Sequence, residues 1–341
     1  MTDDNNRFED EQDDAPDERT SLDEERLRDL DTVFADDWPE DHRSGVIAVV
    51  GRPNVGKSTL INRIVGQKIA AVSPKPQTTR RRQLGIYTEE KGQLLFIDTP
   101  GLHAPRHKLG EFMVGAAEAA FNGADRILVV LNVSEAPEAG DRHLAETVAR
   151  LRGETPVVLA LNKTDLLPSD ATRLPLISQH GNLIEHEQLF LVSALTGGNV
   201  PELTNFLMAQ MPLGPRYYPA DQVSEVNMRF IAGEIIREKA MLRTEKEVPH
   251  AIAVEVESFQ ETPELTRISG IIYVERDNQK AIVIGRGGDM IKQIGTEARL
   301  ELESMLDRRV RLDLRVKVLK NWRSDDRLMR RMGYKVERDE K

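Results

Sequence analysis

Hydrophobic residues between positions 45 and 212 gather in short runs that are separated by longer amphipathic stretches. The runs VIAVVG, QLLFIDT, RILVVLNV, PVVLALN and LFLVSA are rich in β-branched residues, which is typical of strands buried on both faces of a parallel sheet. Helical spacing of apolar residues predicts helices between these runs, over 57–65, 109–122, 141–151, 169–179 and 200–210. This alternation predicts an α/β domain with a doubly wound, mostly parallel sheet.

The order of elements changes after residue 212. A stretch rich in proline, MPLGPRYYPADQV, lacks periodicity and predicts a linker over about 213–223. The next domain, 224–320, is expected to be a small α+β unit with a three-stranded sheet. Its expected order is a helix (224–242), the strands HAIAVEVESF and LTRISGIIYVE, a short helix (278–283), a glycine-rich turn, a longer helix (289–306) and the strand VRLDLRVKVL. A basic arm, 321–341, follows.

Charge and composition narrow the class of protein. Residues 1–44 contain 18 acidic and 5 basic residues, a net charge of −13, so the other 297 residues carry +3. Few apolar residues accompany this charge, so 1–44 is expected to be a disordered acidic extension. The absence of cysteine excludes disulfides and thiol catalysis, and the apolar runs are too short for a membrane span, which needs about 18 residues or more.

The first glycine-rich stretch, GRPNVGKST, lies between a predicted strand and a predicted helix. Its pattern Gly-x-x-x-x-Gly-Lys-Ser in that context is typical of a P-loop, whose backbone wraps around a di- or triphosphate. Lys57 can reach the β- and γ-phosphates, and the Ser58 hydroxyl can bind Mg²⁺. The residues expected to contact the nucleotide here are Gly51, Arg52, Pro53, Asn54, Val55, Gly56, Lys57, Ser58 and Thr59.

The tetrapeptide NKTD, at the end of PVVLALN, indicates that the base is guanine. The Asp165 carboxylate can accept from the ring N–H and the exocyclic amine of guanine, whereas adenine offers the wrong pattern. Asn162 and Lys163 complete this motif. The segment Ser193, Ala194 and Leu195 follows another strand and can contact the base through its main chain; an ordinary strand end is the alternative interpretation.

DTPG, at the end of QLLFIDT, is placed to face the terminal phosphate. Asp98 can hold Mg²⁺ through water, and the Gly101 N–H can meet the γ-phosphate. The loop KPQTTRRRQ carries Thr78 and Thr79, and we expect Thr79 to complete the metal shell; a basic surface loop is the alternative. The expected Mg²⁺ ligands are Ser58, Thr79 and Asp98; the expected catalytic residues are Lys57, Thr79 and Gly101; Thr99, Pro100 and Leu102 join the nucleotide-binding set.

These motifs, in this order, resemble the translation-factor-like class of GTPases. Many members of that class carry glutamine after DTPG, whereas this chain has Leu102, which cannot hold water by hydrogen bonding. The resemblance therefore implies slow intrinsic hydrolysis that relies on a monovalent cation or a partner. Asn54 matches an asparagine that coordinates K⁺ in some relatives, so K⁺ is expected as a second cofactor.

A second glycine-rich turn, IGRGGDMIK, lacks a lysine and a serine of the P-loop type after its glycines. It fits the GXXG loop of KH domains, which clamps about four nucleotides of RNA backbone. A simple helix-joining turn is the alternative, but the order of elements matches a type II KH domain. The residues expected to bind RNA are Gly285, Arg286, Gly287, Gly288 and Lys292, with further phosphate contacts from basic residues of 308–331.

A GTPase domain followed by a KH domain resembles the Era family, and the stretches GRPNVGKSTLINRIVGQKIAAVS, QTTR, DTPGLH, EVPHAIAVEVE and WRSDDRLMRRMGY carry the resemblance. The family implies GTP and GDP as ligands, binding near the 3′ end of small-subunit ribosomal RNA, a role in 30S assembly, and peripheral contact with the inner membrane. We expect a cytoplasmic monomer. Two alternatives stay open, a membrane-associated GTPase switch without RNA and a GTPase component of an RNA-modification system.

Overall fold

The computed structural model describes residues 38–71, 79–80, 83–100, 115, 119–169, 171–224, 227–332 and 334. The predicted acidic extension lies almost wholly outside these residues, as does most of the predicted helix over 109–122. Thr78, Gly101 and Leu102 lie outside them as well.

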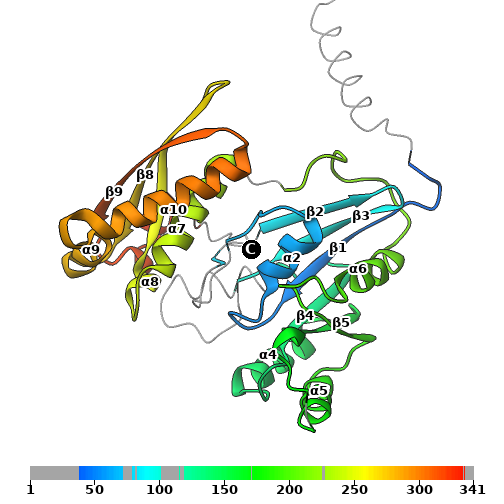
Figure 1. Ribbon diagram of the computed structural model, residues 1–341. Coiled ribbons are helices and arrows are strands. Elements are labelled where there is room, and N and C mark those ends of the chain that lie inside the picture. The colour runs from blue at the N-terminus through cyan, green and yellow to red at the C-terminus, as the bar shows by residue number, and fades with distance from the viewer. Residues whose placement is uncertain are drawn as a thin grey trace, which may run out of the picture. The chain divides into compact units, whose positions relative to one another are not determined.

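The first sheet has six strands in the order β2-β3-β1-β4-β5-β6 (Figure 1). All neighbouring strands are parallel except β2 and β3, which are antiparallel. This confirms the predicted doubly wound, mostly parallel sheet. The strands are β1 (Arg43–Val50), β2 (Gln83–Glu89), β3 (Gly92–Asp98), β4 (Arg126–Asn132), β5 (Val157–Asn162) and β6 (Gln188–Leu191).

Helices and loops cover both faces of this sheet, and β1 shows how its residues divide between them. Ile47 and Val49 belong to a core that includes residues of α2 and α6, whereas Ala48 and Val50 belong to a core that includes α4. This division follows from the two-residue period of a strand. The helices are α2 (Lys57–Val65), α4 (Ala139–Leu151), α5 (Arg173–Gly181) and α6 (Val200–Ala209).

The segment predicted as a linker makes hydrogen bonds to β3 and to the edge strand β2 of this sheet. The side chain of Gln93 accepts hydrogen bonds from the backbone N–H groups of Tyr217 and Tyr218, at 2.9 and 3.0 Å. Farther along, the Ile86 N–H donates to the carbonyl of Val223 at 2.9 Å. Proline and the lack of periodicity excluded a helix here, but they carried no information about these contacts.

The second sheet has three strands in the order β7-β8-β9, of which the first pair is antiparallel and the second parallel. Its core combines residues of the sheet with α7, α9 and α10; Ile294, Ala298 and Leu302 are the fully buried stripe of α10, at the four-residue spacing of one helix face. The elements are α7 (Met228–Leu242), α8 (Val248–Ala251), β7 (Ala253–Glu261), β8 (Leu265–Val274), α9 (Asp277–Ile284), η2 (Arg286–Gly288), α10 (Asp289–Leu306) and β9 (Arg309–Val318). The predicted α+β order is confirmed.

Part of the basic arm folds back onto this second sheet. It forms η3 (Trp322–Ser324) and α11 (Asp326–Arg331), and Trp322 is fully buried among β7 and β8 residues, Met329 and Tyr334. The indole N–H of Trp322 donates to the carbonyl of Ala251 at 2.9 Å. Aromatic and methionine residues therefore fix part of an arm for which the sequence predicted only phosphate contacts and solvated charges.

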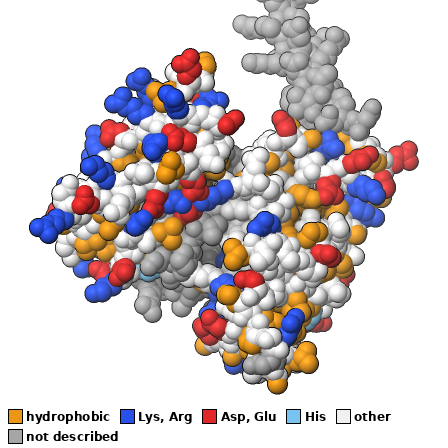
Figure 2. Space-filling view, in the orientation of Figure 1, with side chains coloured by type: hydrophobic (Ala, Val, Ile, Leu, Met, Phe, Trp, Pro, Cys, Tyr) orange, Lys and Arg blue, Asp and Glu red, His pale blue; other side chains and the backbone are white. Residues whose placement is uncertain are grey.

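Basic and acidic side chains intermingle on the face shown in Figure 2. Within the described part of the chain, no helix has the length and apolar character needed to cross a membrane.

Candidate functional sites

The first glycine-rich loop connects β1 to α2, and glycine is needed at both of its ends. A Cβ at Gly51 would lie 2.4 Å from the carbonyl oxygen of Val130, and one at Gly56 would lie 2.3 Å from Nδ2 of Asn162. Gly56 has φ +99° and Asn54 has φ 66°, values that glycine and asparagine tolerate best. The loop therefore leads directly into the N-terminus of α2, where backbone N–H groups without helical partners favour an anion.

Lys57 is held at the base of this loop. Its Nζ donates to the carbonyl oxygens of Gly51 and Arg52, at 3.0 and 3.1 Å. Burial lowers the pKa of Lys57 to about 8, and only the charge of Asp98 opposes this effect. A phosphate placed in the loop would raise this pKa again, because a nearby negative charge favours the charged form of the lysine.

The side chain of Arg52 is committed to α4 rather than to the loop. It donates to Asp141 at 2.7 Å and to Glu138 at 2.5 Å. Burial tends to lower the pKa of Arg52, but the hydrogen bond and charge of Asp141, with Glu138, raise it overall. Of the expected nucleotide contacts, Arg52 therefore offers its backbone.

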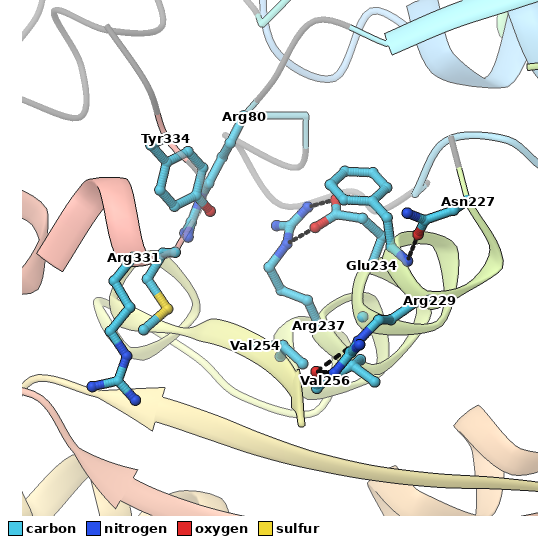
Figure 3. Close-up of a pocket in the computed structure, with 12 residues that line it drawn as sticks. Arg80, Asn227, Arg229, Glu234, Arg237, Val254, Val256, Arg331 and Tyr334 are labelled. Carbon is cyan, nitrogen blue, oxygen red and sulfur yellow. Dashed lines mark hydrogen bonds and ion pairs between the residues drawn. The ribbon is translucent and has the colours of Figure 1, made fainter. Parts of the chain in front are cut away.

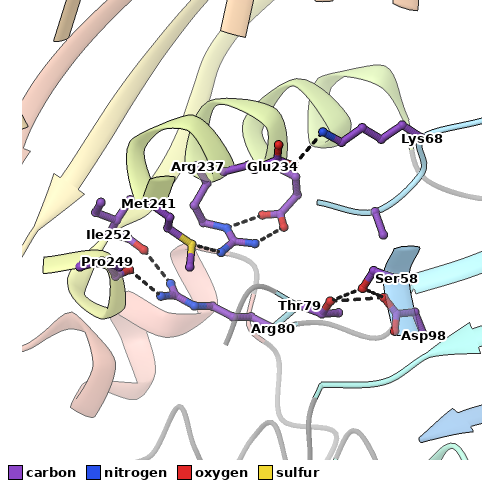
Figure 4. Close-up of polar contacts among 12 residues, drawn as sticks. Ser58, Lys68, Thr79, Arg80, Asp98, Glu234, Arg237, Met241, Pro249 and Ile252 are labelled. Carbon is purple, nitrogen blue, oxygen red and sulfur yellow. Dashed lines mark hydrogen bonds and ion pairs between the residues drawn. The ribbon is translucent and has the colours of Figure 1, made fainter. Parts of the chain in front are cut away.

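Three oxygen-bearing side chains meet beside the loop. Ser58 Oγ donates to Asp98 Oδ2 at 2.6 Å and lies 2.8 Å from Thr79 Oγ1, which donates to the same carboxylate oxygen at 3.3 Å (Figure 4). Burial raises the pKa of Asp98, while Lys57, Ser58 and Thr79 act in the opposite direction. The second oxygen, Oδ1, is buried without a hydrogen-bond partner among the described residues. The structure thus brings together all three expected Mg²⁺ ligands.

The neighbouring Thr99 and Pro100 are buried, and the Thr99 hydroxyl donates to the carbonyl of Val49 at 2.7 Å. This bond joins the end of β3 to β1, so Thr99 positions Asp98 through the backbone. The expected phosphate contacts of Gly101 and Leu102 fall outside the described residues and stay predictions.

Asn162 braces three motifs against one another. Its Nδ2 donates to the carbonyl of Val55 in the glycine-rich loop at 2.8 Å, and its Oδ1 accepts from the Ala194 N–H at 2.9 Å. Asn162 is 2% exposed. The sequence predicted a base-binding residue here, and the structure adds this connecting role.

Asp165 is the exposed member of the same motif. Its Oδ1 accepts from the Ser193 hydroxyl at 2.5 Å, and its side chain lies at the surface. Lys163 has φ 67°, so the backbone turns sharply between Asn162 and Asp165. Leu195 is 68% exposed beside them. An exposed carboxylate held by one hydroxyl can accept two further donors from a purine.

The sequence did not reveal that Arg63 of α2 supports this region. Its guanidinium donates to the backbone carbonyls of Ala194, at 3.2 Å, and of Leu195. Arg63 occupies an ordinary helix position, and no local pattern distinguishes it from a solvated arginine.

The glycines of the second glycine-rich turn have two different structural roles. A Cβ at Gly285 would lie 2.6 Å from Cβ of Met290, so Gly285 is needed for packing. Gly287 and Gly288 have φ of +62° and +85° and have open space where a Cβ would be. Arg286 and, one turn into α10, Lys292 are exposed. An extended polyanion can therefore approach this backbone closely, with two cations beside it.

Several basic residues of 308–331 are paired with glutamates. Arg308 and Arg331 lie 3.7 and 3.2 Å from Glu261 and Glu255, and two further arginines, Arg315 and Arg323, pair with Glu257 and Glu275. These four arginines already have acidic partners, so they are less available for phosphate than the sequence indicated.

Comparisons with known proteins agree with this geometry. A model of the family described as 50S ribosome-binding GTPase matches residues 46–163, and a KH domain model matches residues 247–323. GTPase Era of Staphylococcus haemolyticus is 43% identical over 300 residues, which cover 88% of this chain and 99% of that protein.

Two solved structures are similar over most of the chain. One is a variant of Aquifex aeolicus Era bound to GDP·AlF4⁻, with a TM-score of 0.80 and 38% identity. The other is Era in complex with MgGDPNP and nucleotides 1506–1542 of 16S ribosomal RNA, with a TM-score of 0.80 and 37% identity. Each covers 86% of this chain and 100% of the other.

Proposed function

The chain belongs to the Era family of GTPases, and we propose that it couples GTP hydrolysis to holding the 3′ region of small-subunit ribosomal RNA during 30S assembly. The main support is the pairing of two unlike phosphate sites in one chain. The first has a buried lysine, and beside its loop the side-chain oxygens of Ser58, Thr79 and Asp98 lie together. The second has two open glycines with the exposed cations Arg286 and Lys292 near them.

Ser58, Thr79 and Asp98 are the residues that would hold Mg²⁺. Their fit to this ion is supported by the unpartnered oxygen of Asp98 and by the all-oxygen donor set, which Mg²⁺ prefers. A bound Mg²⁺ would neutralise charge on the β- and γ-phosphates. The solved Era complex with MgGDPNP is a relative that contains this ion with a nucleotide.

Lys57 and the loop from Gly51 to Gly56 supply the other charge compensation. The ammonium group, which donates to two loop carbonyls, would instead donate to the phosphates and stabilise charge that grows during hydrolysis. Gly101 and Leu102 are proposed to face the γ-phosphate and the water. A leucine in place of a hydrogen-bonding side chain implies slow intrinsic turnover.

Guanine would be selected by Asp165, whose exposed carboxylate can accept two base N–H groups. Asn162 would hold this motif against the phosphate loop, through Val55, and against Ala194. An adenine would leave the carboxylate without its donors, a mismatch that polar sites reject strongly.

The KH domain would hold RNA at Arg286, Gly287, Gly288 and Lys292. Phosphates would approach the open glycine backbone, because no side chain of the described residues occupies that space. The relative solved with 16S ribosomal RNA nucleotides 1506–1542 supports this RNA as the ligand. We also propose a cytoplasmic location, with peripheral contact at the inner membrane as the family resemblance implies.

The RNA assignment is tested by placing charge in the turn. Gly287→Asp with Gly288→Asp should weaken binding of an RNA matching the 16S 3′ region at least tenfold, because carboxylates repel phosphate and fill the open space. GDP binding should stay unchanged, since the P-loop is untouched. A matched control, Arg308→Ala, removes a charge already paired with Glu261 and should have little effect. Equal RNA affinity of the double variant and the wild type would contradict the assignment.

We propose K⁺ as a second ion of the nucleotide site, near Asn54. The support is the sequence match at Asn54, its positive φ within the loop and its exposure. Hydrolysis should be faster in KCl than in NaCl at equal ionic strength, and Asn54→Ala should remove the difference. Equal rates of the wild type in both salts would contradict K⁺ as a cofactor.

A further inference from the structure

Arg80 follows Thr79 directly in the chain, yet its side chain is buried at 2% exposure. Its guanidinium donates to the backbone carbonyl of Ile252 at 2.6 Å (Figure 4). It also donates to the carbonyl of His250 at 3.0 Å. A third carbonyl, that of Pro249, lies at 3.5 Å. These carbonyls belong to the end of α8 and the residue after it, so a residue of the GTPase sequence motif is held by the KH domain.

An aromatic pair completes this environment. The guanidinium carbon of Arg80 lies 5.5 Å from the ring centre of Trp322, within the range of cation–π attraction. Trp322 is itself fixed by its bond to Ala251 and stacks on Tyr334, with ring centres 5.9 Å apart. We call the carbonyls of 249, 250 and 252 with these two rings the Arg80 socket.

The socket holds a positive charge without neutralising it through its carbonyls. Burial lowers the pKa of Arg80, while Tyr334 and Glu234 act in the opposite direction; the nearby Arg237, itself paired with Glu234, adds to the lowering. A cavity of about 270 Å³ lies beside the socket and is lined by Arg80, Arg237, Glu234 and Tyr334 among others (Figure 3). Arg80 thus contributes both to the socket and to the wall of this cavity.

The peptide bond between Thr79 and Arg80 links this socket to the side-chain oxygens of Ser58, Thr79 and Asp98. Consecutive Cα atoms are about 3.8 Å apart, so carbonyl bonds of the Arg80 guanidinium limit Thr79 to positions within the reach of the arginine side chain. The Thr79 hydroxyl lies 2.8 Å from Ser58 and 3.3 Å from Asp98 at the same time. The positions of the socket and of the Thr79 hydroxyl are thus mutually restricted.

We propose that Arg80 is a positioning residue: seated in its socket, it holds Thr79 beside Ser58 and Asp98 and so links metal-dependent GTP hydrolysis to the α8 and Trp322 region of the KH domain. This inference rests on the proposed role of Thr79 as a metal ligand. Linkage is reciprocal, so whatever favours the seated arginine favours Mg²⁺ and GTP, and the reverse.

Variants of Arg80 test the link from the GTPase side. Arg80→Gln and Arg80→Lys should raise the Mg²⁺ concentration for half-maximal GTP hydrolysis at least fivefold, within the usual range of coupling between sites. Lysine keeps the charge but cannot bond several carbonyls at once. The KM for GTP at saturating Mg²⁺ should change less than the Mg²⁺ requirement, because the P-loop and base contacts are untouched.

Lys68 provides a matched control for any contact between the domains. Its Nζ pairs with Glu238 of α7 at 2.7 Å and with Glu301 of α10, but it has no neighbour in the metal-type cluster. Lys68→Ala should change the Mg²⁺ requirement less than twofold. Trp322→Phe tests the link from the KH side, because it weakens the cation–π contact and removes the bond to Ala251.

The environment of the Arg80 side chain in its socket can be followed by the fluorescence of Trp322. The chain has two tryptophans, so Trp38→Phe leaves Trp322 as the remaining one. In that background, exchanging GDP for a non-hydrolysable GTP analogue with Mg²⁺ should change Trp322 emission or its quenching by acrylamide. The change should be absent when Arg80→Gln is added.

The outcomes separate this inference from the function it rests on. An unchanged Mg²⁺ requirement of Thr79→Ala would contradict the metal role of Thr79. A raised requirement for Thr79→Ala together with wild-type behaviour of folded, GTP-binding Arg80→Gln and Trp322→Phe would overturn the Arg80 link alone.

Discussion

Asn162 offers the sharpest test of how the nucleotide site is held together. Asn162→Ala removes a bond of 2.8 Å to the Val55 carbonyl and one of 2.9 Å from the Ala194 N–H. Both backbone groups would be left buried without their partner, and each such loss costs about 1–3 kcal/mol. The variant should therefore lose about 2–6 kcal/mol of stability in the nucleotide-free state, from the same accounting of unsatisfied groups.

Thermal unfolding followed by circular dichroism, with and without GDP, measures this loss. For a domain of this size each kcal/mol shifts the midpoint by about 2–4 °C, so the midpoint of the GTPase domain should fall by at least about 4 °C without nucleotide. Affinity for a fluorescent GDP should fall at least about tenfold, which corresponds to about 1.4 kcal/mol.

Asp165→Ala is the matched control in the same motif. Asp165 is exposed and has one hydrogen bond, to Ser193, so its loss should relax discrimination against adenine nucleotides and leave the nucleotide-free midpoint nearly unchanged. If Asn162→Ala weakens GDP binding while the nucleotide-free midpoint stays at the wild-type value, Asn162 acts only on the base and the bracing role is wrong.

Three further predictions concern the two phosphate sites. Asp98→Asn should abolish the extra thermal stabilisation that Mg²⁺ gives the GDP-bound protein, because it removes the buried charge beside the metal-type hydroxyls; a shift equal to that of the wild type would contradict this role. Because the pKa of Lys57 is lowered to about 8, free protein loses this proton above pH 8 while the unfolded chain keeps it up to about pH 10.4; stability without nucleotide should rise over that window. GDP binding should then take up a proton at pH 8.5 and weaken as pH rises, which calorimetry in buffers of different ionisation enthalpy would detect, and binding without proton uptake would count against it. Gly285→Ala should destabilise the KH domain by about 1–3 kcal/mol through strain and its overlap with Met290, whereas Gly288→Ala should cost only about 1–2 kcal/mol of backbone strain and mainly weaken RNA binding; the reverse order of stabilities in urea unfolding would refute this distinction.

Most of the sheet and helices could be predicted because their signals are local. The buried runs around Val49 and Leu159 are apolar along their whole length, as central parallel strands require. β2 was missed because it is an edge strand, with polar Gln83 and Thr88 and a glycine among its apolar residues. Such a segment has no period of its own and becomes a strand by pairing with β3.

Residues of the candidate sites likewise divide into those with a local sequence signal and those without one. Residues of the phosphate loop are fixed by spacing in one continuous segment, so Lys57 and Ser58 could be named from sequence. The brace of Asn162 and the support from Arg63 join segments more than 100 residues apart, and no local pattern encodes such contacts. Arg80 is the clearest case, because RRR in a basic loop predicts solvent exposure and only the distant carbonyls and Trp322 make a buried site for it.

The central claim, two phosphate sites of which one hydrolyses GTP and the other holds ribosomal RNA, is tested most directly in living cells. The protein and its Gly287→Asp, Gly288→Asp variant would be crosslinked to RNA by ultraviolet light, and the attached RNA sequenced. The wild type should yield reads concentrated near the 3′ end of small-subunit ribosomal RNA, and the variant should lose them while still hydrolysing GTP. Reads spread evenly over cellular RNA, or an unchanged 3′ peak in the variant, would contradict the claim.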